Sequence, residues 1–419
     1  MSIPNEQLLL IEQLLNLPGV RVLSAEIGAR DITIQVEITD QFATCRHCGR
    51  RATEFHGHGE VLRLRHLPVF DRDVHLSLRP KRYRCQQCDD HPTTTQRDDW
   101  YDARSGCTRA FANALLRALV KSTLSDVARL HRVSYDLLRG LLGREVSAAV
   151  DWSQISSLPV LGLDEIALLK GHRDFVTIVS TRDERGGPVL LAVLEGRAKE
   201  TVSAFLRSIP EALRATIEQV CTDLYEGFAN AVREVVPTAG VIADRFHVAK
   251  LYRGAVDTLR KSEMKEIKQT LSAAEYAGLK GVLWAFRRNR RDLDAEALEL
   301  LDLLFECSPS LRQAHALREE FSLIFETKQS KETARRAITA WSRKVRRSGL
   351  GCFDSFLATL EHWMDEITNY FVSRLSSGWV EGFNNKIKVL KRRCYGLSNP
   401  ANLFRRIWLD LNGDHVFAL

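Results

Sequence analysis

The chain has 419 residues, of which 45% are apolar and 27% charged, a composition typical of folded domains and not of a disordered chain. At about 100–200 residues per domain, this length predicts two to four domains. No apolar run approaches the roughly 18 residues of a membrane span. Glu6 and Glu12 precede the first basic residue, Arg21, and nine cysteines are an odd number. We therefore expect a cytoplasmic protein without membrane spans, an ordinary secretory signal or a disulfide framework.

The net charge of +7 is small, so the distribution of basic residues is more informative than their total. Ten Arg and Lys residues but only four acids lie between Arg46 and Arg84. Further basic clusters occur at residues 287–291, 343–347 and 386–393. One such cluster alone is usually a solvated helix face, but the recurrence favours a nucleic-acid partner.

Two C-x-x-C pairs, Cys45 with Cys48 and Cys85 with Cys88, are separated by sequence with strand alternation. This pattern resembles a zinc ribbon, in which four thiolates hold one structural Zn²⁺. Unligated cysteines and redox chemistry are the alternatives, although redox chemistry needs a single pair at a helix start. Basic residues between the pairs are predicted to contact DNA: Arg63, Arg65, Lys81, Arg82 and Arg84.

Helical patterns follow a polar linker at residues 89–99. We expect helices over residues 107–122, 124–131 and 134–146, with a turn at Arg132-Val133 and Ser134 as an N-cap. This arrangement resembles a helix-turn-helix, with Tyr135 and Arg139 of its last helix predicted to face a DNA major groove. An ordinary helical hairpin is the alternative.

The texture changes to β from Leu158. We expect strands near residues 158–168, 175–180, 189–194, 219–222 and 240–243, with helices over 200–217 and 228–236. This order matches a ribonuclease H-like fold. The helical texture of residues 250–364 predicts an insertion that splits this domain, and a basic helix over 379–393 then completes it.

The predicted fold is therefore a multidomain mixture of α/β and all-α parts. It begins with a zinc-binding module (residues 1–98) and a helix-turn-helix (99–150). The ribonuclease H-like domain occupies 151–250 and 368–419, on either side of the helical insertion at 251–367.

Three carboxylates are candidate catalytic residues. Asp164 and Asp223 each follow an apolar strand, and Glu381 opens the basic C-terminal helix. Adjacent strands would bring the two aspartates together, and a helix against the sheet could add Glu381. Carboxylates so placed repel each other unless cations lie between them, and hard oxygen ligands suit Mg²⁺ or Mn²⁺.

The strings GLDE at Asp164, DRFH at Asp244 and above all EGFNNKIKVLKRRCYG at Glu381 resemble DDE transposases of bacterial insertion sequences, with the ISL-three branch closest. The resemblance covers essentially the whole chain. It implies that Asp164, Asp223 and Glu381 form a catalytic triad that binds two divalent metal ions. It also implies cleavage by water at the end of the element and attack of the freed 3′-hydroxyl on another phosphodiester.

Asp244 leaves one alternative open, because it also follows an apolar strand and could be the second catalytic carboxylate. Together with His247 it forms a D-x-x-H element that either supports the active site or makes a purely structural hydrogen bond. Several residues of the last basic helix are predicted to contact DNA: Asn384, Asn385, Lys386, Lys388, Lys391, Arg392 and Arg393.

We therefore predict a transposase that binds terminal inverted repeats in double-stranded DNA and catalyses metal-dependent strand cleavage and transfer. It would act in the bacterial cytoplasm, associated with the nucleoid when bound. Because two DNA ends must be held together, a homodimer on DNA is expected. The alternatives are a sequence-specific regulator with an inactive ribonuclease H-like fold and a structure-specific nuclease that cleaves without joining.

Overall fold

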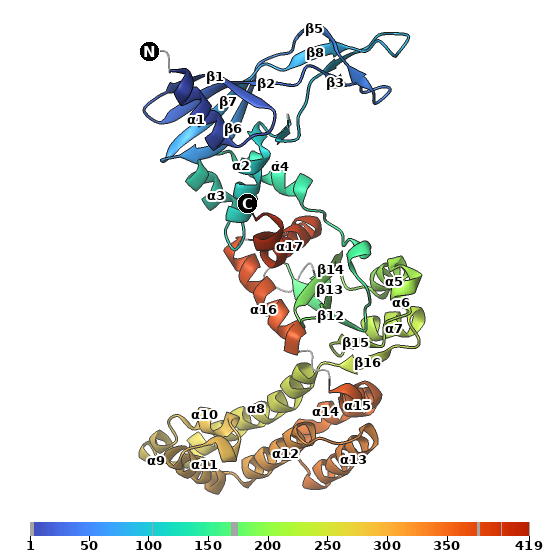
Figure 1. Cartoon of the computed structure of the whole chain (residues 1–419). Coiled ribbons are helices and arrows are strands. Elements are labelled where there is room, and N and C mark those ends of the chain that lie inside the picture. Colours follow the sequence, from blue (N-terminus) through green and yellow to red (C-terminus); the bar gives the residue numbers. More distant parts are fainter. Residues whose placement is uncertain (1–3, 103, 169–174, 375–377, 395, 419) are drawn as a thin grey trace. The chain divides into compact units, whose positions relative to one another are not determined.

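The computed structural model describes residues 4–102, 104–168, 175–374, 378–394 and 396–418 (Figure 1). The chain forms two compact units. Unit 1 comprises residues 1–148, 390–395 and 405–419, and unit 2 comprises residues 149–389 and 396–404. Within the described ranges, no helix is both long and apolar enough to cross a membrane.

Unit 1 contains a six-stranded sheet whose inner strands alternate buried and exposed residues. Its strands are, in order across the sheet, β1 (Val20–Ile27), β2 (Asp31–Ile38), β7 (Arg72–Leu78), β6 (Leu62–Val69), β11 (Cys107–Thr108) and β10 (Tyr101–Asp102). Apolar side chains such as Ile34, Leu64 and Leu76 form its core, with partly buried residues of helix α1 (Asn5–Leu15) packed against them. Ile34, Val36 and Ile38 of β2 alternate along the strand and are buried.

The cysteine pairs lie outside this sheet, in two small sheets of their own. One is the hairpin of β3 (Ala43–Thr44) and β4 (Arg51–Ala52), and the other has the order β5 (Glu54–His58), β8 (Lys81–Arg84) and β9 (Thr93–Thr95). The spacer between the pairs is long because it also contains the β6–β7 hairpin of the larger sheet. The expected polar linker at residues 89–99 is partly wrong, because its threonine run pairs with β8 as β9.

Three short helices complete the N-terminal part of unit 1: α2 (Arg109–Ala118), α3 (Leu124–His131) and α4 (Tyr135–Glu145). Each begins at a capping hydroxyl, of Thr108, Thr123 and Ser134 respectively. Arg132 ends α3 in the left-handed conformation, at the predicted turn. The C-terminal segment packs here as well, since buried Arg406 donates hydrogen bonds to the carbonyl oxygens of Leu119 (3.1 Å) and Ser122 (2.7 Å).

Unit 2 is built on a five-stranded mixed sheet. Its order is β14 (Pro188–Glu195), β13 (Phe175–Arg182), β12 (Val160–Ala167), β15 (Gln219–Thr222) and β16 (Gly240–Ala243). The first three strands are antiparallel, and β12, β15 and β16 are mutually parallel. All five predicted strands are present. Strand β12 continues past Asp164, and β13 continues past its expected end at residue 180.

Helices cover both faces of this sheet (Figure 1). One face carries α5 (Lys199–Ser208), α6 (Glu211–Arg214) and α7 (Glu226–Val235), and the other carries α16 (Gly378–Arg393). The single helix expected over residues 200–217 is wrong. It is divided at Pro210, because proline has no amide hydrogen to donate and its ring disfavours a helical residue before it.

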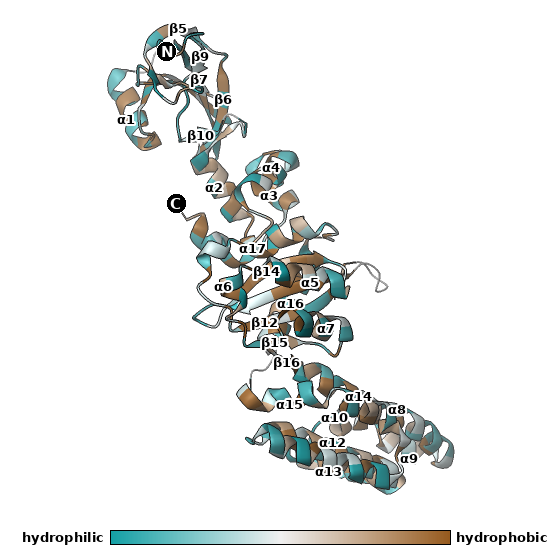
Figure 2. Cartoon of the chain, turned by 90° about the vertical axis from the view of Figure 1, so that its right-hand side faces the viewer, coloured by the Kyte–Doolittle hydropathy of each residue, from teal (hydrophilic) through white to brown (hydrophobic). Residues whose placement is uncertain are grey.

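Between β16 and α16 the chain is entirely helical where it is described. The helices are α8 (Arg245–Thr270), α9 (Ala273–Gly278), α10 (Val282–Arg287), α11 (Ala295–Cys307), α12 (Pro309–Glu326), α13 (Lys331–Ser348), α14 (Asp354–His362) and α15 (Met364–Ser373). Their buried side chains form one continuous core with the sheet, and hydrophilic residues follow the surface of α13 (Figure 2). Helix α15 is anchored to β16, because the Asn369 amide donates to the Val241 carbonyl oxygen at 2.7 Å.

The last described helix, α17 (Pro400–Val416), follows α16 after residues 396–399, which form neither helix nor strand. Helix α16 agrees with the basic helix expected over residues 379–393 and begins one residue earlier, at Gly378.

His66 on β6 links the larger sheet of unit 1 to α2. Its buried ring nitrogen lies 2.9 Å from the hydroxyl of Thr108, the residue that caps α2, and burial lowers its pKa to about 4. A histidine with a depressed pKa stabilises the fold above pH 6.5, and this stability is lost as the pH falls toward 4, because only the unfolded chain takes up the proton readily.

We therefore expect hydrogen-exchange protection of β6 and α2 to fall by about 3 kcal/mol between pH 7 and pH 4. In His66→Gln, which keeps a hydrogen-bonding side chain but cannot be protonated, this fall should be a small fraction of the fall in the wild-type protein. Protection of β12 in unit 2 serves as the internal control. An equal fall of β6 protection in both proteins would contradict the assignment.

Candidate active site and zinc site

The four cysteines of the two C-x-x-C pairs converge. Their sulfur atoms all lie within 4.8 Å of one another, with Cys45–Cys88 at 4.0 Å and both Cys48–Cys85 and Cys85–Cys88 at 3.7 Å. A tetrahedral Zn²⁺ with bonds of about 2.3 Å needs sulfur–sulfur edges of about 3.8 Å. The donor set and its dimensions therefore fit a structural zinc ion, as the sequence predicted.

Backbone amides prepare this site for thiolates. The amides of Cys48 and His47 lower the pKa of the Cys45 thiol to about 6, and the His47 N–H lies 3.5 Å from its sulfur. Burial acts in the opposite direction on Cys88 and raises its pKa. A cation that replaces the thiol protons would resolve this imbalance within the cluster.

The basic residues predicted to contact DNA around this module differ in what they touch. Arg63 is exposed, whereas Arg65 forms an ion pair with Asp73 (2.5 Å) and stacks on Phe111. Lys81 donates to the Ile38 carbonyl oxygen (3.2 Å), and Arg82 donates to the Thr93 hydroxyl (2.8 Å). Arg84 is half-buried on the same strand, β8.

The first turns of α4 present the side chains that the helix-turn-helix interpretation selected. Tyr135 is 48% exposed, and Arg139 forms an exposed ion pair with Asp136 at 2.9 Å. Leu138, Leu141 and Leu142 on the opposite face are buried against α2. Helix α4 thus offers a polar surface to a partner while its apolar face holds the three-helix unit together.

Asp164 and Asp223 lie at neighbouring positions of two adjacent parallel strands. Leu163 of β12 pairs with Thr222 of β15, so each aspartate is the next residue after this pair. The strand β12 continues beyond Asp164, which pairs with Ile178 of β13, whereas β15 ends at Thr222. The sequence had suggested that Asp164 follows its strand, but the residue lies within β12.

Burial and mutual repulsion make both carboxylates reluctant to ionise. Burial raises the pKa of Asp164 to about 6, with the charge of Asp223 as the second cause. Burial also raises the pKa of Asp223 to about 6, and the charges of Glu165 and Asp244 add to the effect. Two such groups side by side form a site that a cation would stabilise.

Asp244 occupies the corresponding position after β16, but its carboxylate is already engaged. One oxygen accepts from the Phe246 amide (2.7 Å) as the N-cap of α8, and the other lies 3.1 Å from Nδ1 of His247. This hydrogen bond is the main reason why the pKa of His247 is raised, with the charges of Asp164 and Asp223 adding to it. The imidazole is therefore an electrostatic neighbour of both candidate catalytic aspartates.

Helix α16 crosses β12 in close contact next to Asp164. The contact occurs at Gly162, where an added Cβ would lie 2.7 Å from Val380 and 2.9 Å from Trp379. Trp379 also lies against the guanidinium of Arg182, so this indole packs within the unit. The sequence signal for this contact is an isolated glycine within an apolar strand, which often marks a close approach.

The first two turns of α16 carry Glu381 and Asn384. The buried Asn384 side chain donates a hydrogen bond to the Asp164 carboxylate, and its own oxygen is buried without a hydrogen-bond partner in the described structure. Glu381 is half-buried three residues earlier and thus on the same helix face. The sequence analysis had placed Asn384 on a DNA-contacting surface and did not foresee its contact with Asp164.

Among the described residues, the four cysteines are the only group of three or more metal-ligating side chains whose ligand atoms lie within 4.8 Å of one another. Asp164, Asp223 and Glu381 are therefore not drawn together as tightly as a metal-bound set would be.

Most of the remaining basic residues of α16 face solvent. Asn385, Lys386, Lys388 and Arg392 are exposed. Lys391 is half-buried, which lowers its pKa, and Arg393 forms an ion pair with Asp410.

Comparisons with known proteins agree with this organisation. Residues 161–407 match a family model described as transposase, of the ISL3 (ISL-three) type, and residues 41–88 match the zinc-finger of transposase IS204/IS1001/IS1096/IS1165. The chain is 30% identical over 398 residues to the transposase for insertion sequence element IS1001 of Bordetella parapertussis, covering 94% of this chain and 95% of that protein.

More distant similarities were also found. The transposase for insertion sequence element IS1557 of Mycobacterium tuberculosis is 25% identical over 391 residues, covering 88% of this chain and 86% of that protein. A solved chain of the Drosophila P element transposase strand transfer complex has a TM-score of 0.41 and 12% identity, covering 74% of this chain and 93% of that chain. The chain thus contains a zinc ribbon of the transposase type. It belongs to the ISL3 family of insertion-sequence transposases.

The convergence of the four sulfurs predicts the metal content of the protein. Purified wild-type protein should contain about one zinc ion per chain, because four thiolates satisfy one tetrahedral site. Cys85→Ser should lose most of this zinc and destabilise unit 1, whereas Cys352→Ser, a matched change in unit 2, should keep it. Metal analysis by mass spectrometry measures both. Full zinc content in Cys85→Ser would contradict the site.

The contact at Gly162 predicts a penalty for adding a single methyl group. Gly162→Ala should destabilise unit 2 by about 1–3 kcal/mol, since Val380 and Trp379 must move to admit the new atom. Gly240→Ala is the matched control in the same sheet, because a Cβ added there would lie 3.8 Å from the Glu218 carbonyl oxygen, at ordinary van der Waals distance. Urea unfolding followed by tryptophan fluorescence compares the two. Equal midpoints would show that α16 does not pack closely on β12.

Proposed function

We propose that this transposase binds the terminal inverted repeats of an insertion sequence and catalyses metal-dependent cleavage and transfer of DNA strands. In this proposal Asp164, Asp223 and Glu381 are the catalytic carboxylates. The observation that carries it is the adjacent placement of Asp164 and Asp223 across β12 and β15, with α16 packed over β12 beside them. The strand order of unit 2 supports a ribonuclease H-like catalytic domain split by the helical segment α8–α14.

The residues at this site fit divalent cations. The oxygen donors are hard, the pKa of each aspartate is raised by burial, and the Asn384 side-chain oxygen is buried without a hydrogen-bond partner in the described structure. Asp164, Asp223 and Glu381 would hold the ions. Two Mg²⁺ or Mn²⁺ ions there would supply activation of the attacking oxygen and stabilisation of the leaving oxygen in phosphodiester displacement.

The chain's own side chains have separate roles around these ions. Asn384 fixes the orientation of the Asp164 carboxylate by donating to it. His247, held by Asp244, adds positive charge beside the two aspartates and thereby favours their ionised forms. Glu381 approaches from α16, whose position depends on the contact at Gly162.

Asp223, and not Asp244, is the second catalytic carboxylate in this proposal. Both oxygens of Asp244 already serve structural contacts, one with the Phe246 amide and one with His247. Among the described residues, Asp223 has a weak contact with the neighbouring Thr222 hydroxyl, at 3.4 Å. Asp223 also follows β15, the strand next to β12 and Asp164, whereas Asp244 follows β16, one strand further away.

Unit 1 would recognise the DNA ends. We infer that α3 and α4 act as a helix-turn-helix with Tyr135 and Arg139 toward the bases, and that the zinc ribbon adds phosphate contacts through exposed residues such as Arg63. The exposed Asn385, Lys386, Lys388 and Arg392 of α16 would bind DNA phosphates nearer the cleavage site. Two ends must be joined in one reaction, so we propose a homodimer on DNA.

A cleavage assay tests the proposal. Labelled duplex carrying the terminal repeat and its flank is incubated with protein and Mg²⁺ or Mn²⁺. Asp223→Asn should lower cleavage about a thousandfold or more, because a catalytic carboxylate is lost. Asp244→Asn should stay within about tenfold of wild type, since asparagine also caps helices well.

The reverse pattern, with cleavage lost only in Asp244→Asn, would move the second carboxylate to Asp244. Tight, salt-sensitive binding to the terminal repeat without cleavage in either metal would instead indicate a regulator. Cleavage without any joined product would indicate a nuclease.

A further inference from the structure

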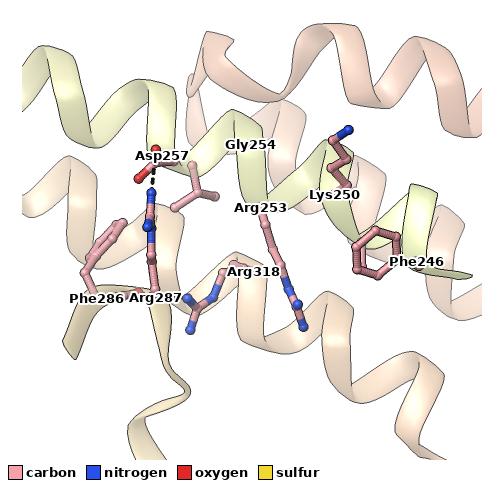
Figure 3. A pocket seen from close by; sticks show the side chains of 10 residues that line it. Phe246, Lys250, Arg253, Gly254, Asp257, Phe286, Arg287 and Arg318 are labelled. Atoms are coloured by element: carbon pink, nitrogen blue, oxygen red, sulfur yellow. Dashed lines mark hydrogen bonds and ion pairs between the residues drawn. The ribbon is translucent and has the colours of Figure 1, made fainter. Parts of the chain in front are cut away.

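A basic cavity lies among the helices that follow the candidate active site. It has a volume of about 400 Å³ and is lined by residues of α8, α10 and α12 (Figure 3). Its charged lining residues are four basic ones and a single acid: Lys250, Arg253, Arg287, Arg318 and Asp257. The one acid is already shared, because Asp257 forms ion pairs with Arg260 (2.9 Å) and Arg287 (3.3 Å). Positive charge therefore predominates in this cavity.

The most buried of these cations, Arg318, forms no hydrogen bond with a carboxylate of any residue that the structure describes. It is 4% exposed, and its guanidinium donates to the carbonyl oxygens of Phe286 (2.8 Å) and Arg288 (2.6 Å). Carbonyl groups satisfy its hydrogens but do not neutralise its charge, and an unpaired buried charge is costly. An anion entering the cavity would offset that cost.

Arg253 faces the same space from α8. Figure 3 shows the Arg253 side chain extending from α8 on the side of the helix where Arg318 lies, whereas Lys250 points the other way. Arg253 is exposed and forms no ion pair with any residue that the structure describes. Two guanidinium groups that line one cavity are suited to the oxygen atoms of a phosphate.

Gly254 leaves open space in the cavity, and the packing of the fold does not require a glycine at this position. It lies within the 26-residue helix α8, where glycine costs about 0.5–1 kcal/mol relative to alanine. A Cβ at this position would meet no atom within 4 Å, so no neighbour in the unit explains the glycine. The open space lies beside Arg253, where a ligand could approach the helix backbone.

The cavity reaches the first turn of α8, the helix that Asp244 caps next to the candidate active site. Phe246 lines it, is 48% exposed, and lies edge-on to the His247 ring at a centroid distance of 6.0 Å. His247 in turn is bonded to Asp244, beside the aspartates at the ends of the parallel strands. Arg253 follows Asp244 by nine residues of α8, about 14 Å along the helix, or about four nucleotides of B-form rise.

A second cavity nearby provides a contrast. It is larger, at about 680 Å³, but its two arginines are paired: Arg290 with Asp302 (2.6 Å) and Arg291 with Glu326 (2.7 Å). Its lining also includes Glu319 and Glu320. Unpaired positive charge thus distinguishes the first cavity from the second, although both lie in the same helical segment.

We propose that this cavity holds the DNA strand that leaves the active site, with a phosphate between Arg253 and Arg318 and a base against Phe246. The proposal rests on the proposed function, since it identifies the strand as DNA being cut. The chemistry recognised is a phosphate group, which a free nucleotide also carries, so the test separates the two sources.

The test measures binding of full-length protein to fluorescent dT20 by anisotropy. Arg253→Ala and Gly254→Leu, which fills the open space, should each weaken binding about tenfold, and Arg253→Ala should lower the slope of log K against log salt by about 0.7. Gly278→Leu is the matched control, because its Cβ also meets no atom within 4 Å but it does not line the cavity. Exposed Arg343→Ala on α13 controls for charge, and both controls should stay within about twofold.

Photocross-linking locates the strand. A 4-thiothymidine-substituted dT20 should cross-link to the peptide that contains Phe246 in wild type and in Gly278→Leu, but not in Gly254→Leu. Unchanged dT20 affinity in both cavity variants, together with no cross-link to that peptide, would overturn the proposal. ATP binding that is lost in both variants while dT20 binding persists would also overturn it and make the cavity a nucleotide site.

Failure of the cavity and failure of the proposed function give different results. Wild-type protein that does not cleave terminal-repeat DNA, but whose dT20 binding depends on Arg253 and Gly254, would support the cavity and reject the enzyme. Normal cleavage with dT20 binding that is indifferent to both residues would reject the cavity alone.

Discussion

The parallel pairing of β12 with β15 and β16 is the constraint on which unit 2 depends. Its register places Leu163 beside Thr222, so that Asp164 and Asp223 must follow side by side in a partly buried place. The pairing thus lowers the stability of the fold at one point, because burial raises the pKa of both carboxyl groups there. In the proposed function, the same placement would hold divalent cations, which would offset the charge of the two carboxylates.

Helix α16 completes this site from far away in the sequence. Gly162 admits the helix against β12, and Asn384 then reaches the Asp164 carboxylate. The helices between β16 and α16 share one continuous core with the sheet, so the long intervening segment is packed as part of unit 2. This segment also carries the basic cavity along α8. The same helix begins next to the candidate active site, where Asp244 bonds to His247.

In unit 1, the structural requirement is to hold small sheets together. The four cysteines lie in two short β-hairpin regions with a small core of their own, and the β6–β7 hairpin between the pairs joins the larger sheet. Zinc would supply the stability that this small core lacks. Arg65, although part of the basic sequence cluster, is used to connect β6 with Asp73 and Phe111. A basic cluster therefore mixes structural and exposed cations, which composition cannot separate.

The sequence by itself determined the elements whose signals are local. Short apolar runs predicted the five strands of unit 2, the cysteine spacing predicted the zinc ribbon, and the string that begins at Glu381 indicated the family. Only the tertiary structure decided which groups meet, because the contact of Asn384 with Asp164, or the presence of Arg253 and Arg318 in one cavity, depends on packing between distant segments. It also distinguished two aspartates that follow similar apolar strands: Asp244 caps α8 after β16, whereas Asp223 follows β15, the strand next to β12.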